Sequence, residues 1–329
     1  MTLRTCLLGT AAVFALGVAT AAAQPALVYD MGGKFDKSFN EAAYNGAERW
    51  AADTGQSYRD LEVQAEPQRV QFVTRMAEAG ANPVVVLGFS NEATLLEVAP
   101  NYPDTRFVLV DAVVDLPNVR SVIFAEQEGS FLVGMLAAMA SESGTVGFVG
   151  GMDIPLIRAF ACGYAQGAAH VNPSIRVIQN YTGSTPAAWN DPVRGGEITQ
   201  AQISQGADVV FAAAGGTGLG VLQTAADAGI LSIGVDSNQN YLHPGSVLTS
   251  MIKLVDNAVY QAFADGPDLE TGVVVMDLAS GGVGYALDEY NADLISAEME
   301  AAVEAARTAI IAGDLAVHDY RTDDSCPVN

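Results

Sequence analysis

Residues able to hold a small polar molecule gather where a short apolar segment ends, close to the start of the chain. The apolar segment 26–29 predicts a buried strand, and Asp30 follows it directly. After a pair of glycines that permits a tight turn, Phe39 and Asn40 stand at the beginning of a helical pattern. A carboxylate accepts hydrogen bonds, an amide donates and accepts them, and an aromatic ring offers a flat face. This stretch therefore predicts a binding site between the carboxyl end of a strand and a helix.

Two further aspartates end predicted strands. Asp111 follows the apolar segment 107–110, and Asp236 follows 231–235. In open α/β sheets the carboxyl ends of the strands border the crevice in which ligands bind. Each aspartate is therefore a candidate acceptor for a ligand, and the alternative for each is the N-cap of the helix that follows.

A glycine-rich turn at 216–220 precedes a helix, and with Asp236 beyond it this unit imitates a dinucleotide-binding fingerprint. Its third glycine, however, comes one residue too early for that pattern. Two other interpretations remain open. The turn allows close helix packing, or its backbone N–H groups, including that of Gly216, meet ligand oxygens while Asp236 accepts from a ribose hydroxyl.

Signatures of catalysis are missing from the sequence. The three histidines, His170, His243 and His318, are far apart along the chain. There is no P-loop, no HExxH and no G-x-S-x-G motif, and no Cys/His pair has the spacing of metal ligands. We therefore expect a binding protein that uses no cofactor and no metal.

Length and charge indicate the number of domains and the kinds of ligand that the protein can bind. A chain of 329 residues predicts about two domains. Its formal net charge of -23 argues against binding nucleic acid or anionic lipid through bulk charge. Half of the residues are hydrophobic and 33 are glycine, which suits an α/β protein with tight turns.

The first 23 residues have the pattern of a signal peptide. Arg4 precedes the apolar stretch 7–22, and small residues at 21–23 form an A-x-A cleavage site before Gln24. Cys6 lies inside this leader and not at the cleavage site. We therefore expect a soluble periplasmic protein without a lipid anchor.

Cleavage would leave two cysteines, Cys162 and Cys326. In an oxidising compartment they could form a disulfide. Alternatively, Cys162 is a buried apolar residue and Cys326 is free in the tail. The sequence leaves both interpretations open, because spacing along the chain does not give distance in space.

Strand and helix signals alternate along the chain, which predicts parallel sheets built from βα units. We expect strands at 26–29, 61–63, 83–88, 107–110, 119–124, 146–151, 176–178, 209–213, 231–235 and 273–276. We expect helices from 40, and at 69–79, 91–99, 129–141, 156–171, 191–205, up to 228, 254–265 and 295–312.

The second half of this pattern repeats the first, which predicts two Rossmann-like lobes with a ligand cleft between them. This is the architecture of the type I periplasmic binding proteins, which close about a hinge. We expect residues 24–124 plus 253–277 in the N-terminal lobe and 125–252 plus 278–329 in the C-terminal lobe.

One motif carries a resemblance to a known family. The pattern DxGGxxDKSFN occurs here as Asp30, Gly32, Gly33 and the segment 36–40. It resembles the basic membrane protein (BMP) family of bacterial substrate-binding proteins, which includes PnrA-like purine nucleoside receptors. The resemblance continues to about Lys253 and so covers most of the mature chain.

This resemblance implies that a purine base lies between two aromatic rings, one from each lobe. Phe39 matches the ring of the first lobe, and Trp189 resembles its counterpart in the second. Stacking on either ring would contribute about 1–3 kcal/mol per base. Core packing is the alternative for Phe39, and a position at the lobe edge is the alternative for Trp189.

The resemblance also implies polar contacts. Asp30 and Asn40 would bind the base, and Asp111 and Asp236 would accept from the ribose hydroxyls. Lys253 would reach the ligand or steady Asp236. Gly216 is placed at the ligand, and Met31 and Ser90 are placed in the pocket wall.

The sequence thus favours a periplasmic receptor of an ABC importer that binds a purine nucleoside and catalyses no reaction. Its partners would be a permease and an ATPase in the inner membrane, and the protein itself would be a monomer. Two alternatives remain. One is a secreted enzyme, either nucleoside-processing or nicotinamide-dependent, and the other is a receptor for another small molecule on the same fold.

Overall fold

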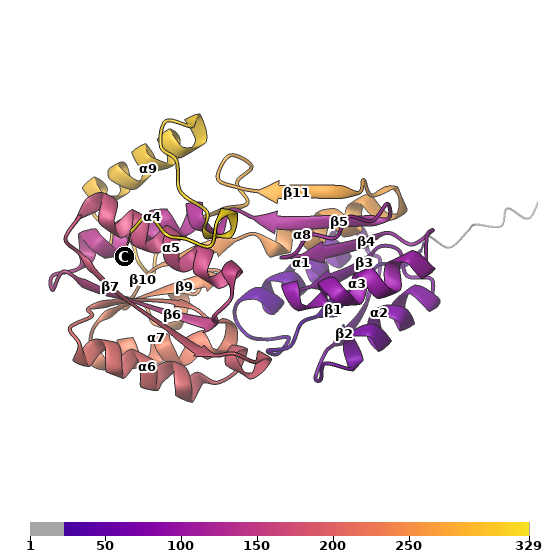
Figure 1. The fold of residues 1–329 in the computed structure, drawn as a ribbon, viewed down its shortest axis with the longest axis horizontal. Coiled ribbons are helices and arrows are strands. Elements are labelled where there is room, and N and C mark those ends of the chain that lie inside the picture. Colours follow the sequence, from indigo (N-terminus) through magenta and orange to yellow (C-terminus); the bar gives the residue numbers. More distant parts are fainter. Residues whose placement is uncertain (1–22, 329) are drawn as a thin grey trace, which may run out of the picture.

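The computed structural model describes residues 23–328. Figure 1 shows two α/β lobes lying side by side along the longest axis of the molecule. Apart from Ala23, the expected signal peptide lies outside the described residues. Within the described part of the chain no helix is both long and apolar enough to cross a membrane.

The first lobe is built on a six-stranded sheet in the order β11-β5-β4-β3-β1-β2, in which all neighbours are parallel. Its strands are β1 (Ala26–Tyr29), β2 (Arg59–Glu62), β3 (Val84–Leu87), β4 (Phe107–Val110), β5 (Val119–Phe124) and β11 (Gly272–Met276). Its helices are α1 (Phe39–Thr54), α2 (Gln68–Glu78), α3 (Glu92–Val98) and α8 (Val255–Asp265). The continuous apolar runs of β1, β3 and β4 are fully buried, as expected for strands covered on both faces.

The second lobe has a matching sheet in the order β12-β10-β9-β8-β6-β7, in which all neighbours are parallel except β12, which is antiparallel to β10. Its strands are β6 (Thr145–Met152), β7 (Arg176–Gly183), β8 (Val209–Ala213), β9 (Leu231–Asp236), β10 (Val247–Lys253) and β12 (Val283–Tyr285). Its helices are α4 (Glu126–Ala140), α5 (Pro155–Val171), α6 (Pro192–Ser204), α7 (Gly218–Ala228) and α9 (Ala297–Ala312). By position in the sheets, β4 corresponds to β9 and β5 to β10.

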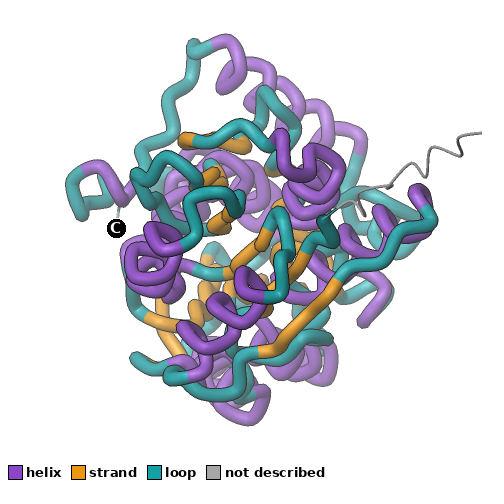
Figure 2. Tube along the Cα trace, turned by 90° about the vertical axis from the view of Figure 1, so that its right-hand side faces the viewer, coloured by secondary structure: helices purple, strands orange, loops and turns teal. Residues whose placement is uncertain are grey.

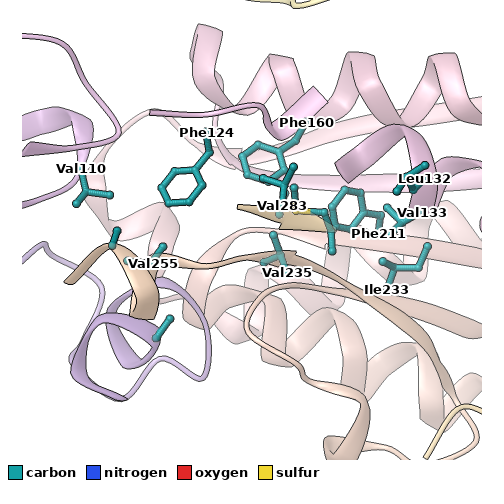
Figure 3. Close-up of a cluster of buried hydrophobic side chains, with 14 of the residues drawn as sticks. Val110, Phe124, Leu132, Val133, Phe160, Phe211, Ile233, Val235, Val255 and Val283 are labelled. Carbon is teal, nitrogen blue, oxygen red and sulfur yellow. The ribbon is translucent and has the colours of Figure 1, made fainter. Parts of the chain in front are cut away.

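Helices lie on both faces of each sheet, and the end-on view in Figure 2 shows most strands between helices, while the edge strand β11 is largely exposed. In the first lobe α1 packs against α8, and α2 packs against α3; in the second lobe the pairs are α4 with α5 and α6 with α7. One hydrophobic core extends through both lobes on the side of α1, α8, α4 and α5 (Figure 3). Two smaller cores lie on the opposite faces of the sheets.

The chain crosses between the lobes three times, after β5, after β10 and after β11. Hydrogen bonds tie these crossings together. The Ala125 N–H donates to the Met276 carbonyl at 3.0 Å, and the Leu254 N–H donates to the Gly282 carbonyl at 2.9 Å. The carboxyl ends of the parallel strands in both sheets therefore face one junction.

Most expected elements are confirmed, but three features differ. We expected no strand at 247–253 or at 283–285, and β7 extends to Gly183 instead of ending at 178. β10 contains polar residues, so a search for continuous apolar runs does not identify it as a strand. Two of these are buried and satisfied by side-chain bonds: the Thr249 hydroxyl donates to the Ala286 carbonyl, and the Ser250 hydroxyl donates to Asn240 Oδ1.

Candidate functional site

A cavity lies between the lobes, where the carboxyl ends of the strands meet. Residues from both lobes line it, and apolar side chains form most of its wall. The lining comprises Asp30, Met31, Asp36, Phe39, Asn40, Gly88, Phe89, Asp111, Leu156, Ile157, Phe160, Trp189, Ala213, Ala214, Gly215, Val235, Asp236 and Lys253. A concave, largely apolar site with a few convergent polar groups is typical of small-molecule binding.

The loop from 30 to 40 owes its shape to Asp36, which caps the start of α1. One of its oxygens accepts from the Ser38 and Glu41 N–H groups, and the other accepts from the Asn40 N–H at 3.1 Å. These are backbone donors that the first turn of a helix leaves unpaired. Burial raises the pKa of Asp36 to about 7 in spite of these bonds. The cap fixes Phe39, the first residue of α1, at the cavity.

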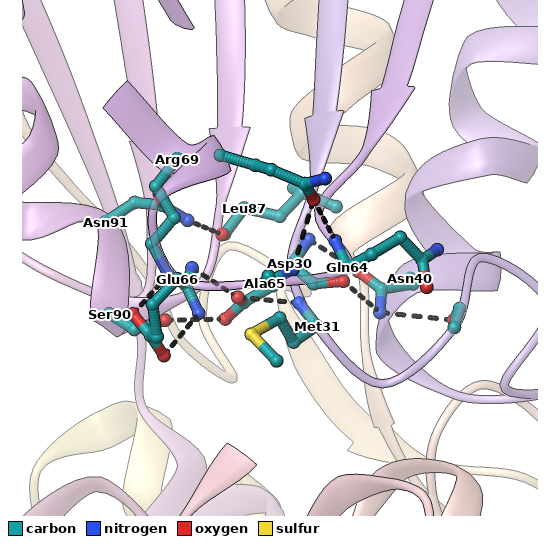
Figure 4. A network of polar contacts seen from close by, with 12 residues as sticks. Asp30, Met31, Asn40, Gln64, Ala65, Glu66, Arg69, Leu87, Ser90 and Asn91 are labelled. Atoms are coloured by element: carbon teal, nitrogen blue, oxygen red, sulfur yellow. Dashed lines mark hydrogen bonds and ion pairs between the residues drawn. The ribbon is translucent and has the colours of Figure 1, made fainter. Parts of the chain in front are cut away.

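Asp30 is held by a buried cation, as Figure 4 shows. One oxygen accepts from Arg69 Nη1 at 2.5 Å and the other from the Ser90 hydroxyl at 2.9 Å. Arg69 is only 3% exposed. Burial raises the pKa of Asp30, and the Arg69 guanidinium opposes that rise. Gly88 makes room for this carboxylate, because a Cβ there would come within 2.0 Å of its oxygen.

The Asn40 amide is largely occupied within the protein. Both of its N–H bonds donate to backbone carbonyls, at Asp30 and Gly33, and its oxygen accepts from the Asp30 N–H. An amide oxygen has two lone pairs, so one acceptor position remains free for a ligand. Asn40 therefore holds the loop closed around Asp30 and can offer a ligand only an acceptor.

The second lobe supplies an aromatic face through Trp189. This residue ends a short 3₁₀ turn, Pro186–Trp189, and is half-buried at the cavity wall. Its ring lies over β6 at Gly151, where an added Cβ would come within 2.0 Å of a ring carbon. A side chain at position 151 would therefore displace the ring from the cavity.

Asp111 and Asp236 occupy equivalent places, since β4 and β9 have the same position in their sheets. Both have left-handed backbone conformations, with φ of 75° and 64°. This region is costly for residues other than glycine and is often occupied at functional sites. The strained backbone places both carboxylates at the cavity, where burial raises the pKa of each, for Asp111 to about 6.

Lys253 lies between the lobes and is 2% exposed. Its Nζ is 2.7 Å from the Asp111 carboxylate and 3.1 Å from a Glu126 oxygen. Burial alone would lower the pKa of Lys253, but the Asp111, Glu126 and Asp236 carboxylates together raise it above its ordinary range. The ammonium is also 5.2 Å from the centre of the Phe39 ring, a cation–π contact. It therefore remains charged at neutral pH.

The lobes contact each other at the loop that carries Phe39. The Ser38 hydroxyl donates to Asp236, and the Ser237 hydroxyl donates to the Ser38 carbonyl at 3.0 Å. The Gln239 amide donates to the Lys37 carbonyl at 2.9 Å. These bonds join the two walls of the cavity, so the described arrangement is a closed one.

Almost all of the residues singled out in the sequence meet at this cavity. The exceptions are Ser90, which contacts Asp30 from behind the wall, and Gly216, which lies next to the lining residue Gly215. Sequence reasoning missed Asp36 as a lining residue, although it lies inside the motif. It also missed Phe160 and its neighbours on α5, which follow β6 at the same edge of the sheet.

The two cysteines are joined in the structure, with their sulfur atoms 2.07 Å apart. This disulfide lies outside the cavity lining and connects α5 to the C-terminal tail. Among residues 23–328 there is no group of three or more His, Cys, Asp or Glu residues placed to hold a metal ion.

Comparison with known proteins identifies relatives. Residues 23–318 match the Bmp family model, described as "ABC transporter substrate-binding protein PnrA-like". The "ABC transporter nucleoside-binding protein BmpA" of Lactococcus lactis is 33% identical, over 89% of this chain and 88% of that protein. An uncharacterised lipoprotein of Pyrococcus horikoshii is 33% identical, over 79% of this chain and 68% of that protein.

A solved structure confirms the expected fold class. An ABC transporter solute-binding protein from Aeropyrum pernix superposes with a TM-score of 0.83 at 27% identity. The match covers 92% of this chain and 95% of the other. The family resemblance seen in the sequence is confirmed as well.

Proposed function

The chain belongs to the Bmp family of ABC transporter substrate-binding proteins, and on this basis we propose that it binds a purine nucleoside for an ABC importer. The observation that carries the ligand class is the cavity itself. It presents one half-buried aromatic side chain from each lobe, Phe39 and Trp189, together with two carboxylates at strand ends. The nucleoside-binding relative from Lactococcus lactis supports the same ligand class.

In this proposal the base stacks on Phe39 and Trp189, which both have a flat face to offer. Asp111 and Asp236 accept from the ribose hydroxyls, and a vicinal diol suits two ionised carboxylates as hydrogen-bond acceptors. Lys253 stays beside Asp111 and keeps it ionised by its positive charge.

The edge of the base faces Asp30 and Asn40. Asp30 Oδ1 already accepts from Arg69 and from the Met31 N–H, whereas Oδ2 accepts only from Ser90 and keeps a lone pair. Asn40 also keeps one, so both residues would accept from ring or exocyclic N–H groups. Gly216 would offer its backbone N–H from the glycine-rich turn. Met31 and Ser90 would complete the wall on the first lobe.

We propose that the two lobes are rigid bodies that close on the ligand, with residues 24–124 plus 253–277 in one and 125–252 plus 278–329 in the other. The closed form would then be recognised by a permease and ATPase in the inner membrane, with the receptor acting as a monomer. The bonds from Ser38 and Gln239 across the junction support closure, because they can form only when the lobes are together.

Binding without reaction separates this proposal from an enzyme. The test incubates the protein with inosine, adenosine and guanosine, measures binding by thermal shift and then analyses the recovered ligand by chromatography. We expect at least one nucleoside to raise the melting temperature by mass action and to be recovered unchanged. Conversion to base and sugar would show an enzyme. If the protein binds a different small molecule and none of the three nucleosides, it is a receptor of this fold, but the nucleoside proposal is wrong.

We further propose that the mature protein begins at Gln24 and is free in the periplasm. Relatives from Pyrococcus carry the name lipoprotein, whereas Cys6 lies inside the expected leader here. Mass spectrometry of the protein from the periplasm should give an unmodified chain starting at Gln24. A lipid-modified cysteine would contradict this proposal.

A further inference from the structure

The C-terminal tail, defined here as residues 313–328, returns from α9 to the junction of the lobes. In Figure 1 the yellow segment after α9 runs to a short turn near the middle of the molecule. That turn is the 3₁₀ segment Tyr320–Thr322. Two contacts attach the tail to α5: the Gln166 side chain bonds the backbone N–H and carbonyl of His318, both at 2.9 Å, and Cys326 is linked to Cys162.

Attachment of the tail brings Arg321 to the first crossing between the lobes. Its Nη1 lies 2.9 Å from Glu126 Oε2, and its Nη2 donates to the Phe124 carbonyl at 3.0 Å. Asp319 holds the guanidinium from the other side, with Nη2 2.9 Å from its oxygen. Phe124 ends β5 and Glu126 begins α4, so Arg321 joins the strand that precedes the first crossing to the helix that follows it.

Glu126 links this arginine to the cavity. Its side chain is completely buried, and its second oxygen lies 3.1 Å from Lys253 Nζ. Lys253 in turn lies 2.7 Å from Asp111, which lines the cavity. A continuous row of alternating charges therefore leads from the tail through Arg321, Glu126 and Lys253 to Asp111.

The balance of charge in this row depends on the tail. With Asp236 included, the buried cluster holds three carboxylates, and Lys253 and Arg321 are the cations that face them. Without Arg321, Glu126 would be a buried carboxylate whose only cationic partner among residues 23–328 is Lys253, the partner that Asp111 also needs. An uncompensated buried charge is costly, so the lysine would be drawn toward Glu126 or a carboxylate would take up a proton.

We propose that the disulfide-anchored tail is part of the binding machinery, in which Arg321 is a positioning residue that neutralises Glu126 and so leaves Lys253 and Asp111 set for the ligand. The part of this inference that concerns ligand binding rests on the proposed function. The part that concerns the charge of the buried cluster does not depend on any ligand.

The binding test is a double-mutant cycle with inosine, adenosine and guanosine, measured by calorimetry. Arg321→Met should weaken binding on the order of tenfold, because a strong coupling between contacting charges has that size. Glu126→Gln added to Arg321→Met should recover most of the loss, and Arg321→Lys should retain most of the affinity. Arg120→Met is the matched control: Arg120 is half-buried, donates to a carbonyl and pairs with Asp265, at the opposite end of β5.

Wild-type affinity in Arg321→Met, or a loss that Glu126→Gln does not reduce, would overturn the inference. In the second case the arginine would act through packing alone. If the wild type binds none of the nucleosides, the proposed function fails. The charge balance of the buried cluster is then still tested by the pH dependence of stability, which needs no ligand.

That measurement compares the melting temperatures of unliganded Arg321→Met and wild type between pH 5 and pH 8. Loss of the guanidinium should raise the folded-state pKa of Asp111, the carboxylate that it faces across Glu126, while Glu126, Asp236, Lys253 and Asp319 remain in both proteins. The folded variant then binds more protons than the unfolded chain, so its stability falls as pH rises. The deficit of the variant relative to wild type should therefore be larger at pH 8 than at pH 5. A deficit that does not change with pH would contradict the inference.

The anchor is tested with Cys162→Ala combined with Cys326→Ser. Thiol counting of the denatured, unreduced wild type should first find no free thiol. In the double variant the melting temperature should fall below that of the wild type, and by more at pH 8 than at pH 5, as in Arg321→Met. The change with pH should be smaller than in Arg321→Met, because the tail retains its contacts with Gln166. A double variant with the pH profile of the wild type would show that the disulfide does not serve to place Arg321.

Discussion

The two aromatic side chains of the cavity are positioned in different ways, although they are proposed to do the same work. Phe39 is the first residue of α1 and is fixed by the cap that Asp36 forms, whereas Trp189 depends on the absence of a side chain at Gly151. Each ring is half-buried before any ligand is considered. A ligand would therefore cover faces that are already oriented, which limits the entropy that binding must overcome.

Removal of either ring should weaken binding of a nucleoside. Phe39→Ala and Trp189→Ala should each cost about 1–3 kcal/mol, which is about ten- to a hundredfold in affinity. Trp189→Phe should cost little, because a flat face remains. Calorimetry gives the values, and Phe35→Ala is the control, since Phe35 lies in the same loop and is 60% exposed. Unchanged affinity in Phe39→Ala would exclude stacking on this ring.

Asp236 is proposed to contact the sugar and not the base. Asp236→Asn should therefore weaken binding of a nucleoside far more than binding of the corresponding free base. Ser38→Ala is the matched control, because it removes the bond between Ser38 and Asp236 that closes the lobes and should affect both ligands alike. Equal losses for nucleoside and base in Asp236→Asn would show that Asp236 is no ribose contact.

At the scale of elements, the start of α1 carries a titratable group whose burial opposes its ionisation. The ordinary pKa of an aspartate is 3.8, and burial raises that of Asp36 to about 7 in the folded protein. Between these values the folded state binds more protons than the unfolded state. The contribution of Asp36 to stability is thus fully present below about pH 4 and is lost as pH rises through about 7.

Asp36→Asn should remove this contribution. Denaturant unfolding of the unliganded protein between pH 4.5 and pH 8 should show that the free energy of unfolding falls less steeply with pH in the variant than in the wild type. Its value at low pH should also drop, because the capping carboxyl group is changed. An unchanged slope across this range would mean that Asp36 does not titrate as described.

Much of the fold and part of the site could be predicted from the sequence. Buried strands such as β3 and β4 are continuous apolar runs between turn residues, so local pattern identifies them. β10 could not be found in this way, because Thr249 and Ser250 are satisfied only by partners distant in the chain. The contact of Glu126 with Arg321 joins residues from opposite ends of the second lobe, and no local pattern signals it.

The whole molecule combines two equivalent sheets with one asymmetric junction. Asp111 and Asp236 are related by the repeat, and both have strained backbones at the same edge of their sheets. Lys253, the last residue of β10 before the second crossing, contacts Asp111 directly and is attracted by both carboxylates. The buried charges thus line the cavity that closure of the lobes creates. A ligand that contacts both lobes would therefore stabilise the closed form.

Isothermal titration calorimetry of the wild-type protein tests the central claim most directly, with inosine, adenosine and guanosine, their free bases, ribose and glucose as parallel ligands. The account predicts that at least one nucleoside binds, and that it binds more tightly than its base or any sugar, because only the nucleoside engages both the aromatic faces and the strand-end carboxylates. Preference for a plain sugar, or equal affinity for a nucleoside and its free base, would contradict it.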